Sequence, residues 1–454
     1  MDKIISLCKR RGFIFPSSEI YGGFSAAYDW GPLGVELAEN IKRAWWRMFV
    51  REREDMAGLD SAIIMNPKVW EASGHLQNFS DPLAECKKCH ERFRVDHLLE
   101  MKSASPGYDK EKPPEAKNFK CPACGGTLTE ARQFNLLFKT HVGPVEEAAA
   151  AAYLRPETAG GIFVNYKNIL QTARKKIPFG IGQIGKAFRN EITVENYIFR
   201  IREFEQMEVE YFVHPKNWEK HFEEWLGVMK KWCAFLGLKD NNLVFHEIAD
   251  EERAFYSQRT IDIEYRYPFG VKELYGLAYR TDYDLSRHGK FSKEDLSYID
   301  PDTGEKFIPH VIEPSLGLQR SALAALVEAY EEVEGGRTIT TQSAKEEEVI
   351  LRLPYELAPV KVAVLPLAKK EPLIKMTREI AEKTRPFWNV QYDEVSSIGR
   401  RYRRQDEIGT PYCVTVDFES LEDKKVTVRD RDTMAQERVE VGGLVEYFKK
   451  KLSC

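Results

Sequence analysis

The chain has 454 residues, enough for two or three domains, and is 43% hydrophobic and 30% charged, which is typical of a globular protein and excludes a largely disordered one. Its 67 basic and 71 acidic residues give a formal net charge of -4, so any nucleic acid would have to be held by a local basic patch. No apolar run approaches the roughly 18 residues of a membrane span, and the basic residues at 9–11 have no secretory core behind them. We therefore expect a cytoplasmic protein without a membrane partner.

The first predicted elements lie between residues 21 and 67. A Gly/Pro turn at 31–34 precedes apolar residues at helical spacing, which are Leu37, Ile41, Ala44, Trp45, Met48 and Phe49. After this long amphipathic helix, residues 61–65 favour a strand that Pro67 stops, because proline removes a donor from the ladder. On the pattern alone, this is an ordinary core helix followed by an edge strand.

Residues 81–145 form a polar insertion with little periodicity. Its four cysteines come in two pairs, Cys86 with Cys89 and Cys121 with Cys124, and such pairs suit tetrahedral zinc. The 31 residues between the pairs exceed the usual ribbon spacing, so a metal-free loop stays an alternative, and disulfides are a weaker one in a cytosolic protein. The remaining cysteines are isolated and expected to be inert: Cys8, Cys233, Cys413 and Cys454.

A helix is predicted after residue 157. The alanines at 148–152 carry no chemical information, but Leu154 to Thr158 lead into a segment that Pro178 ends. Its apolar positions share one face: Ile162, Phe163, Tyr166, Ile169 and Leu170. Glu157 lies at the start, where an acid is ordinarily a cap favoured by the helix dipole.

Residues 185–212 predict two strands joined by a loop. In the second strand, one face carries Phe204, Gln206, Glu208, Glu210 and Phe212, and the other carries Met207, Val209 and Tyr211. In the first strand, Arg189 and Glu191 share a face with Ala187.

Paired, these strands predict an open polar floor for a ligand that is anionic, aromatic and cationic, such as a nucleotide activating an amino acid. Arginine can bind a phosphate, Phe204 can stack on a base, and Glu208 can hold an ammonium group. The alternative is a surface hairpin with cross-strand ion pairs.

Residues 213–330 contribute a helical region and two further strands. Residues 213–260 are predicted to be helical, with a core stripe of Trp218, Phe222, Trp225, Met229 and Trp232. Residues 271–276 favour a strand in which Glu273 is either a magnesium ligand or the partner of a nearby lysine or arginine. Residues 309–320 end a strand and enter a helix at 322–330, where Gly317 permits close backbone approach and Arg320 can add its charge at a phosphate. Glu313 and Ser315 share one strand face.

A second domain is predicted after a linker at 333–350. Strands at 360–367, 390 and 412–417 alternate with segments at 372–385 and 396–407, which indicates a mixed sheet with helical cover. Around Tyr402 lies a basic patch of four arginines, Arg400, Arg401, Arg403 and Arg404. Such a run is ordinarily a solvated helix face, and RNA binding is the alternative.

These segments together resemble the class II aminoacyl-tRNA synthetases, in the glycyl-tRNA synthetase family. Phe-Arg-Asn-Glu at 188–191 and Phe-Arg-Ile-Arg-Glu-Phe-Glu-Gln-Met-Glu at 199–208 resemble motif 2. The segment 21–67, with Trp-Gly-Pro-Leu-Gly at 30–34 and Val-Trp-Glu-Ala-Ser-Gly-His-Leu at 69–76, resembles motif 1, a dimer interface, and 309–320 resembles motif 3.

The resemblance implies an α+β fold in two domains. A class II antiparallel sheet with flanking helices would form a catalytic domain over 1–340, with 81–145 as its insertion. A C-terminal α/β anticodon-binding domain with a mixed sheet would follow over 350–454. The chain would be a homodimer.

The implied function is ATP-dependent activation of glycine with Mg²⁺, followed by transfer to tRNA(Gly). Arg189, Arg320 and Glu273 would be catalytic: Arg189 would hold the α-phosphate and Arg320 the γ-phosphate, with Glu191 and Phe204 at adenine. The implied ATP contacts are Arg189, Asn190, Glu191, Phe199, Arg200, Ile201, Arg202, Glu203, Phe204, Glu273, Leu274, Gly317, Leu318, Gln319 and Arg320. The implied glycine contacts are Arg94, Glu157, Phe204, Glu205, Gln206, Met207, Glu208, Glu313, Pro314, Ser315, Leu316 and Gly317. The four arginines at 400–404 would bind tRNA.

Two positions depart from the family pattern. Gly160 stands where glutamine is usual, and Val194-Glu195 replaces Pro-Arg in the motif 2 loop, which leaves contact with the acceptor stem open.

Two rival functions also stay open. A sister class II enzyme for another small amino acid would need a deeper pocket, and a non-catalytic tRNA-binding relative should have lost the phosphate arginines, yet Arg189 and Arg320 are present.

Overall fold

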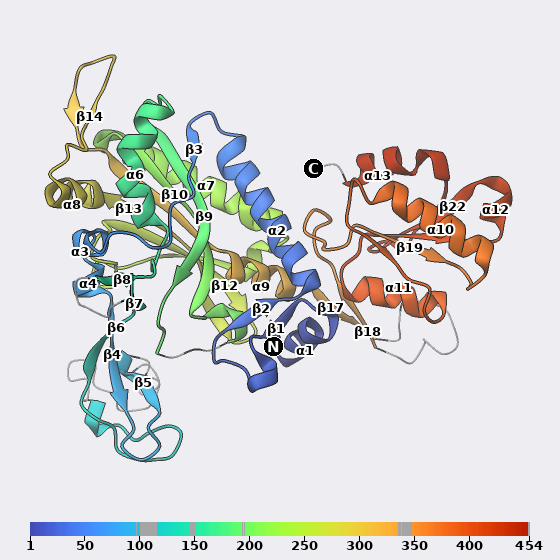
Figure 1. Cartoon of the computed structure of the whole chain (residues 1–454), viewed down its shortest axis with the longest axis horizontal. Helices are drawn as coiled ribbons and strands as arrows, with labels where there is room; N and C mark the ends of the chain where they lie inside the picture. Colours follow the sequence, from blue (N-terminus) through green and yellow to red (C-terminus); the bar gives the residue numbers. More distant parts are fainter. Residues whose placement is uncertain are drawn as a thin grey trace.

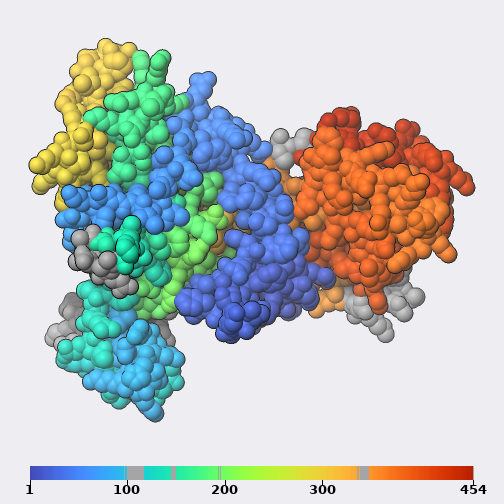
Figure 2. Space-filling view, viewed as in Figure 1, coloured from blue at the N-terminus to red at the C-terminus, as the bar shows by residue number. Residues whose placement is uncertain are grey.

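The computed structural model describes residues 1–96, 98–99, 116–144, 150–192, 194, 196–334, 337 and 347–452. Three expectations lie outside these residues: the part of the motif 2 loop at Thr193 and Glu195, the glycines of the linker at 335–336, and Cys454. The chain forms a large unit on a seven-stranded sheet and a C-terminal unit on a five-stranded sheet (Figure 1). A small module carrying the insertion stands out from the large unit (Figure 2).

The central sheet has the strand order β11-β12-β13-β16-β10-β9-β3. Neighbouring strands are antiparallel except for β3, which runs parallel to β9 at one edge. The strands are β3 (Met56–Gly58), β9 (Phe179–Phe188), β10 (Glu203–Val213), β11 (Leu243–Glu247), β12 (Arg259–Tyr267), β13 (Gly270–Thr281) and β16 (His310–Gly317). The predicted antiparallel class II sheet is confirmed.

Helices cover both faces of this sheet, and successive side chains of a strand pack alternately against one face or the other. Met207, Val209 and Tyr211 of β10 lie in the larger core, on the face covered by α2, α7 and α9. Phe212 lies on the other face, where α6 and α8 pack. The helices are α1 (Asp2–Arg11), α2 (Pro32–Trp46), α6 (Ala159–Thr172), α7 (Trp218–Phe235), α8 (Tyr283–Ser292) and α9 (Leu318–Ala329). The predicted alternation along β10 therefore places a core on both sides of the sheet.

Three predictions of local structure are wrong. Strand β9 ends at Phe188, so Arg189 and Glu191 lie beyond the strand and not on its face with Ala187. Residues 61–65 are not a strand, because Ser61 leaves the sheet edge to donate from its N–H and Oγ to Gln183 Oε1 (3.3 and 3.0 Å). Residues 213–260 are helical mainly in α7, because Gly237 takes a left-handed conformation (φ 81°) just after that helix and the chain then enters β11.

The C-terminal unit has a mixed sheet of order β20-β19-β21-β22-β23, as predicted. The first three strands are parallel and the last three antiparallel. Its elements are β19 (Val362–Pro366), α10 (Glu371–Thr384), β20 (Val390–Tyr392), α11 (Ile398–Glu407), β21 (Tyr412–Val416), α12 (Glu419–Asp423), β22 (Lys425–Asp430), β23 (Gln436–Glu440) and α13 (Leu444–Leu452). A separate apolar core holds this unit together.

Short elements join these parts. Strand β17 (Tyr330–Val333) pairs with β18 (Glu348–Leu351) between the two units, and Arg47 pairs with Glu356 at 3.0 Å. The insertion folds as the three-stranded sheet β5-β4-β6, formed by β4 (Ser80–Glu85), β5 (Arg92–Arg94) and β6 (Arg132–Asn135). Within the part of the chain that the structure describes, no helix has the length and apolar character needed to cross a membrane.

Candidate active site

The predicted residues gather around a cavity of about 320 Å³ beside β9, β10, β13 and β16. A larger cavity, of about 1020 Å³, lies between α2 and the C-terminal unit and is lined by none of them. The predicted residues that line the smaller cavity are Arg94, Arg189, Glu191, Phe199, Arg200, Ile201, Phe204, Gln206, Glu273, Leu274, Ser315, Leu316, Gly317, Gln319 and Arg320. Motifs 2 and 3 therefore meet at one site, although more than 100 residues separate them.

The floor of the cavity combines a cation, aromatic rings and an unused acceptor. Arg189 follows the end of β9, and its guanidinium lies 5.3 Å from the ring centre of Phe204 and 5.4 Å from that of Phe79. Its Nε donates to the Pro156 carbonyl at 3.1 Å, which fixes the direction of the side chain. Glu191 Oε2 is buried and has no hydrogen-bond partner among the residues that the structure describes. This floor can accept a donor from a planar ligand and place a positive charge beside it.

The opposite wall carries Arg320, in the first turn of α9. Its Nη1 lies 3.1 Å from the Glu273 carbonyl oxygen and 3.2 Å from Glu273 Oε2, and its guanidinium lies 4.5 Å from the ring centre of Phe199. Arg320 lowers the pKa of Glu273. An ionised carboxylate beside a phosphate-sized space fits Mg²⁺, which takes few protein ligands and uses substrate phosphates as well.

Glu208 forms the deep end of the site. Ser315 Oγ and Gln206 Nε2 each donate to Glu208 Oε1 at 2.6 Å, and the Thr158 hydroxyl donates to Oε2. Burial and the neighbouring Glu157 raise the pKa of Glu208, against these hydrogen bonds. Because Gln206 and Ser315 also line the cavity, the Glu208 carboxylate continues the cavity inward.

Glu157 lies at the start of α6 but does not cap it. Its Oε2 lies 3.3 Å from His75 Nε2, and His75 Nδ1 lies 2.8 Å from Ser73 Oγ. Burial alone would raise the pKa of Glu157, but His75, Arg280 and Arg189 lower it to about 2. This carboxylate is therefore ionised at neutral pH, and its Oε1 is buried without a hydrogen-bond partner.

Glu313 and Glu210 complete the acidic group. Arg280 Nη1 donates to Glu313 Oε1 at 2.8 Å and also pairs with Asp284. Glu208, Glu210 and Glu313 each place a carboxylate oxygen within 4.8 Å of the others. Both Glu210 oxygens are buried and unpartnered, and burial together with Glu313 raises the pKa of Glu210 well above its usual range. Glu210 is fully buried, so the predicted open floor is closed at this end.

For some of the predicted ATP and glycine contacts, the side chain does not line the cavity, because alternate residues of a strand face opposite sides of the sheet. Met207 and Leu318 are fully buried in the core on the far face of the sheet. Glu205 pairs with Lys42 on that face, and Glu203 pairs with Lys186 at the surface. The side chains of these residues and of Asn190, Arg202 and Pro314 do not line the cavity.

Several residues of the site were not predicted from the sequence. Phe79, Asp81, Leu136 and Ile198 line the cavity, and Thr158, His75 and Arg280 orient its acids. Two of them had a sequence signal, because Thr158 directly follows Glu157 and His75 lies in the motif at 69–76. The departure at Gly160 has a structural reason: a Cβ there would lie 2.9 Å from the Trp70 ring, which already fills the space.

The arginines of α11 are mostly used by the fold. Arg401 is 2% exposed and donates to the carbonyls of Pro366 (2.6 Å), Asp393 (3.1 Å) and Leu367 (3.2 Å), so the predicted tRNA contact of this residue is wrong. Arg404 pairs with Asp393 and Arg403 with Glu348. Arg400 is exposed on the helix.

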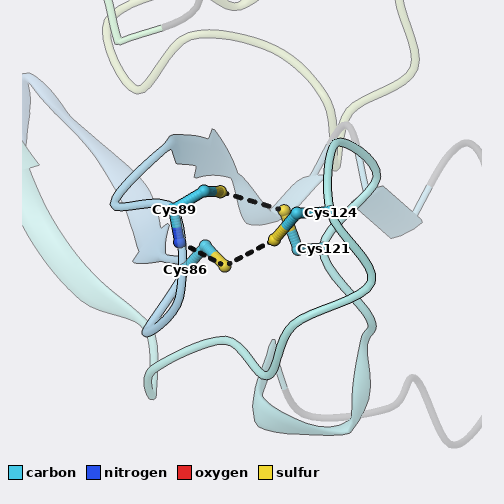
Figure 3. A group of neighbouring side chains, drawn as sticks. All are labelled: Cys86, Cys89, Cys121 and Cys124. Carbon is cyan, nitrogen blue, oxygen red and sulfur yellow. Dashed lines mark hydrogen bonds between the residues drawn. The ribbon is translucent and has the colours of Figure 1, made fainter.

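The four cysteines of the insertion converge. The Sγ atoms of Cys86 and Cys124 lie 3.5 Å apart and those of Cys89 and Cys121 lie 3.6 Å apart, with all four within 4.8 Å of one another (Figure 3). The N–H groups of Lys88 and Cys89 point at Cys86 Sγ (3.4 and 3.5 Å). All four cysteines are free, so the disulfide alternative is not realised. A compact set of four sulfur donors fits a tetrahedral zinc ion.

Comparison with known proteins agrees with this geometry. Residues 138–330 match the family described as tRNA synthetase class II core domain (G, H, P, S and T), and residues 361–451 match the anticodon binding domain. The chain is 53% identical to the glycine–tRNA ligase of Thermobifida fusca and 52% identical to that of Streptomyces coelicolor, in each case over 100% of this chain and 98% of the relative. It is also 53% identical to the glycine–tRNA ligase of Caldanaerobacter subterraneus subsp. tengcongensis, with the same coverage.

The sheet, the two matched domains and the full-length similarity agree with the family that motifs 1, 2 and 3 predicted. Class II synthetases use ATP and Mg²⁺, which the arginines and Glu273 of the cavity fit. This chain belongs to the glycine–tRNA ligase family of class II aminoacyl-tRNA synthetases.

Proposed function

We propose that the cavity binds ATP and glycine together, forms glycyl-adenylate, and passes the glycyl group to tRNA(Gly). The observation that carries this proposal is that a cationic environment and a buried acidic environment are adjacent and continuous. An arginine-lined cavity leads through Ser315 and Gln206 directly to the buried carboxylate of Glu208. A ligand that bridges them must carry phosphates at one end and a small cation at the other. The names of the relatives support glycine over another small amino acid.

The ATP roles follow from the two arginine-bearing walls. Adenine would lie against Phe204, with its amino group donating to the unused oxygen of Glu191. Arg189 would bind the α-phosphate and Arg320 the γ-phosphate. Glu273 would hold Mg²⁺, which when bound neutralises phosphate charge.

The glycine roles follow from the buried acids. Glu157 and Glu208 would hold the ammonium group, with Glu313 and Ser315 closing the pocket around the α-carbon. Ser315 and Thr158 already donate to Glu208, so a larger amino acid would have to displace these hydrogen bonds as well as find space. Such losses discriminate strongly, because they leave buried polar groups unpaired.

Catalysis would come from position and charge. The glycine carboxylate oxygen attacks the α-phosphorus, the bond to the bridging oxygen breaks, and pyrophosphate leaves with its electron pair. Arg189 stabilises the charge that develops on the α-phosphate. The terminal adenosine hydroxyl of tRNA then attacks the glycyl carbonyl and AMP leaves. Neither step requires a nucleophile from the protein.

We propose that the four insertion cysteines hold one zinc ion. The converging sulfur atoms and the N–H groups that face Cys86 support this proposal. Metal analysis of purified protein should find about one zinc per chain, lost when Cys86 and Cys121 are replaced by serine. Protein with no zinc would return the insertion to a metal-free module.

We also propose a cytoplasmic homodimer with 1–340 as its catalytic domain and 350–454 as its anticodon-binding domain. The free cysteines favour a reducing compartment. At the start of the segment that resembles motif 1, Ile20, Tyr21 and Phe24 are 89%, 86% and 64% exposed, and a second copy would cover such side chains. Light scattering on eluted protein should give twice the chain mass of 52.5 kDa.

The direct test uses two assays on one preparation. ATP–pyrophosphate exchange should require glycine and no tRNA, and charging should require tRNA(Gly). Glu208→Gln should lower exchange by raising KM for glycine, whereas Glu223→Gln, an exposed glutamate on α7, should not. If Glu208→Gln left KM for glycine unchanged, the assignment of the acidic pocket would be wrong.

A further inference from the structure

Two strands of the insertion connect the cysteine cluster to the active-site cavity. Strand β4 has Asp81 near its start and is followed directly by Cys86. Strand β5 begins three residues after Cys89 and ends at Arg94. The strands are antiparallel, with Glu85 opposite Arg92 near the cysteines and Leu83 opposite Arg94 toward the cavity. Each strand therefore carries a cysteine at one end and a cavity residue at the other.

The cavity end of this hairpin is a charged pair. Arg94 Nη1 lies 2.8 Å from Asp81 Oδ2, and Arg94 also makes two bonds to Asp96, at 3.1 and 2.6 Å. The side chains of Arg94 and Asp81 are only 17% and 14% exposed. Both line the cavity with Arg189 and Glu191. Arg94 is thus a fixed cation whose position depends on the pairing of β4 with β5.

Among the residues of the insertion that the structure describes, the hairpin packs on a small apolar core. Its core consists of a few buried residues, Ala84, Cys86, Val95, Leu98, Phe119, Cys121 and Leu128, so two of its members are themselves cysteines of the cluster. A module with so small a core needs a staple, and a bound metal supplies one because its ligands are far apart in the unfolded chain. The cluster joins the β4–β5 turn to residues 121–124, which lie on a separate segment (Figure 3).

We propose that the metal held by Cys86, Cys89, Cys121 and Cys124 positions Arg94 in the active site, so that metal occupancy of the insertion sets the affinity of the cavity for ATP. The proposal rests on the zinc site and the ATP site proposed above. The resemblance placed Arg94 at glycine, but Arg94 lines the cavity with Arg189 and Glu191, the residues proposed to bind ATP. Arg94 is therefore the residue that touches ATP, and the cysteines are positioning residues that act through it. Loss of the metal would loosen the register of β4 and β5 and so the placement of Arg94.

The test is a double-mutant cycle on ATP binding. Dissociation constants for ATP are measured by calorimetry, without glycine, for the wild type, Arg94→Ala, Cys86→Ser/Cys121→Ser and the combination. Each change alone should weaken ATP binding about tenfold, the size expected for one charge-assisted contact. If the cysteines act through Arg94, the combination should be no weaker than the worse parent, whereas independent effects would multiply to about a hundredfold. Multiplying effects would overturn the proposal.

Two controls keep the result interpretable. Arg92→Ala removes an arginine two residues earlier on the same strand, 60% exposed and paired with Glu85, and should leave ATP binding unchanged. Chelation of the wild-type protein should weaken ATP binding, and added zinc should restore it without any substitution. Restoration confirms that the metal acts, and chelated protein that binds ATP at full strength contradicts the inference. This inference and the proposed function fail in different ways. Purified protein that contains no zinc would contradict the metal site, whereas protein that shows no glycine-dependent exchange would contradict the proposed activity.

Discussion

The arginines of the cavity and the arginines of α11 have opposite surroundings. Arg189 and Arg320 line a cavity, and each lies beside an aromatic ring. Each guanidinium also donates a hydrogen bond to a backbone carbonyl oxygen. Arg401 is buried and donates to three carbonyl oxygens, and Arg404 pairs with Asp393. Within this dense run, Arg401 is buried, Arg404 is paired and Arg400 is exposed, whereas two arginines 131 residues apart line one cavity. The surroundings of an arginine therefore depend on its position relative to a cavity and not on the number of arginines beside it in the sequence.

The largest effect that would test this comparison is expected for Arg189→Ala. Under the proposed role, in which Arg189 stabilises the developing phosphate charge, this change should cost about 3–4 kcal/mol of transition-state stabilisation in pyrophosphate exchange. Arg266→Ala is the matched control, because Arg266 is exposed on β12 and donates to the Asn241 carbonyl. Near-normal exchange by the Arg189 variant would mean that the floor of the cavity does not bind the reacting phosphate.

A smaller effect, on stability instead of catalysis, is expected for Arg401→Ala. The change leaves the carbonyls of Pro366 and Leu367 without their donor and opens space under α11, which should lower the free energy of unfolding by about 2–3 kcal/mol. Urea denaturation measures it. Glycine-dependent exchange below the unfolding transition should persist, and a variant as stable as wild type would refute the structural role.

A pH-dependent effect is expected for Glu210→Gln. Because burial raises the folded-state pKa of Glu210, its stabilising contribution is complete below the unfolded pKa of about 4.3 and is lost as pH rises toward the folded value. Glutamine cannot ionise, so the variant should gain stability relative to wild type as pH rises from 5 to 8, by at most about 1.4 kcal/mol per pH unit. Glu382→Gln, an exposed change on α10, should show no such trend. Parallel urea midpoints across this pH range would show that burial does not raise the folded-state pKa of Glu210.

The smallest effect is expected for Arg400→Ala, the exposed member of the α11 run. Its stability should stay within about 0.5 kcal/mol of wild type, because the side chain is at the surface. If Arg400 contacts a phosphate, charging at limiting tRNA should fall and the salt dependence of tRNA binding should lose about one unit of slope. Unchanged charging at low and high salt would place the tRNA contact elsewhere on the C-terminal unit.

The sequence predicted those parts of the site whose geometry is local. The two-residue period predicted Gln206 and Glu208 on one strand face and Met207 on the other. Gln206 lines the cavity and donates to Glu208, and Met207 lies in the core, although the resemblance had also implied that Met207 contacts glycine. Helical spacing likewise identified the buried stripe of α7. These inferences needed only the regular geometry of strands and helices.

What the sequence did not predict depends on contacts between distant segments. Asp81 and Phe79 line the cavity because the base of the insertion, where β4 begins, lies beside the central sheet. The burial of Arg401 depends on carbonyls of other segments, at Pro366 and Asp393. The strand expected at 61–65 failed because Gln183 and Arg155 bind Ser61 and draw it off the sheet edge. The periodicity of one segment carries no information about partners that lie far away in the sequence.

The most direct test of the central account is ATP–pyrophosphate exchange with each standard amino acid in turn, in the absence of tRNA. The acids that surround the inner end of the cavity, with Ser315 and Thr158 bound to Glu208, should admit glycine and exclude alanine and serine. We predict exchange with glycine alone. Exchange with alanine or serine at a rate equal to that with glycine, or the absence of exchange with glycine, would contradict the account.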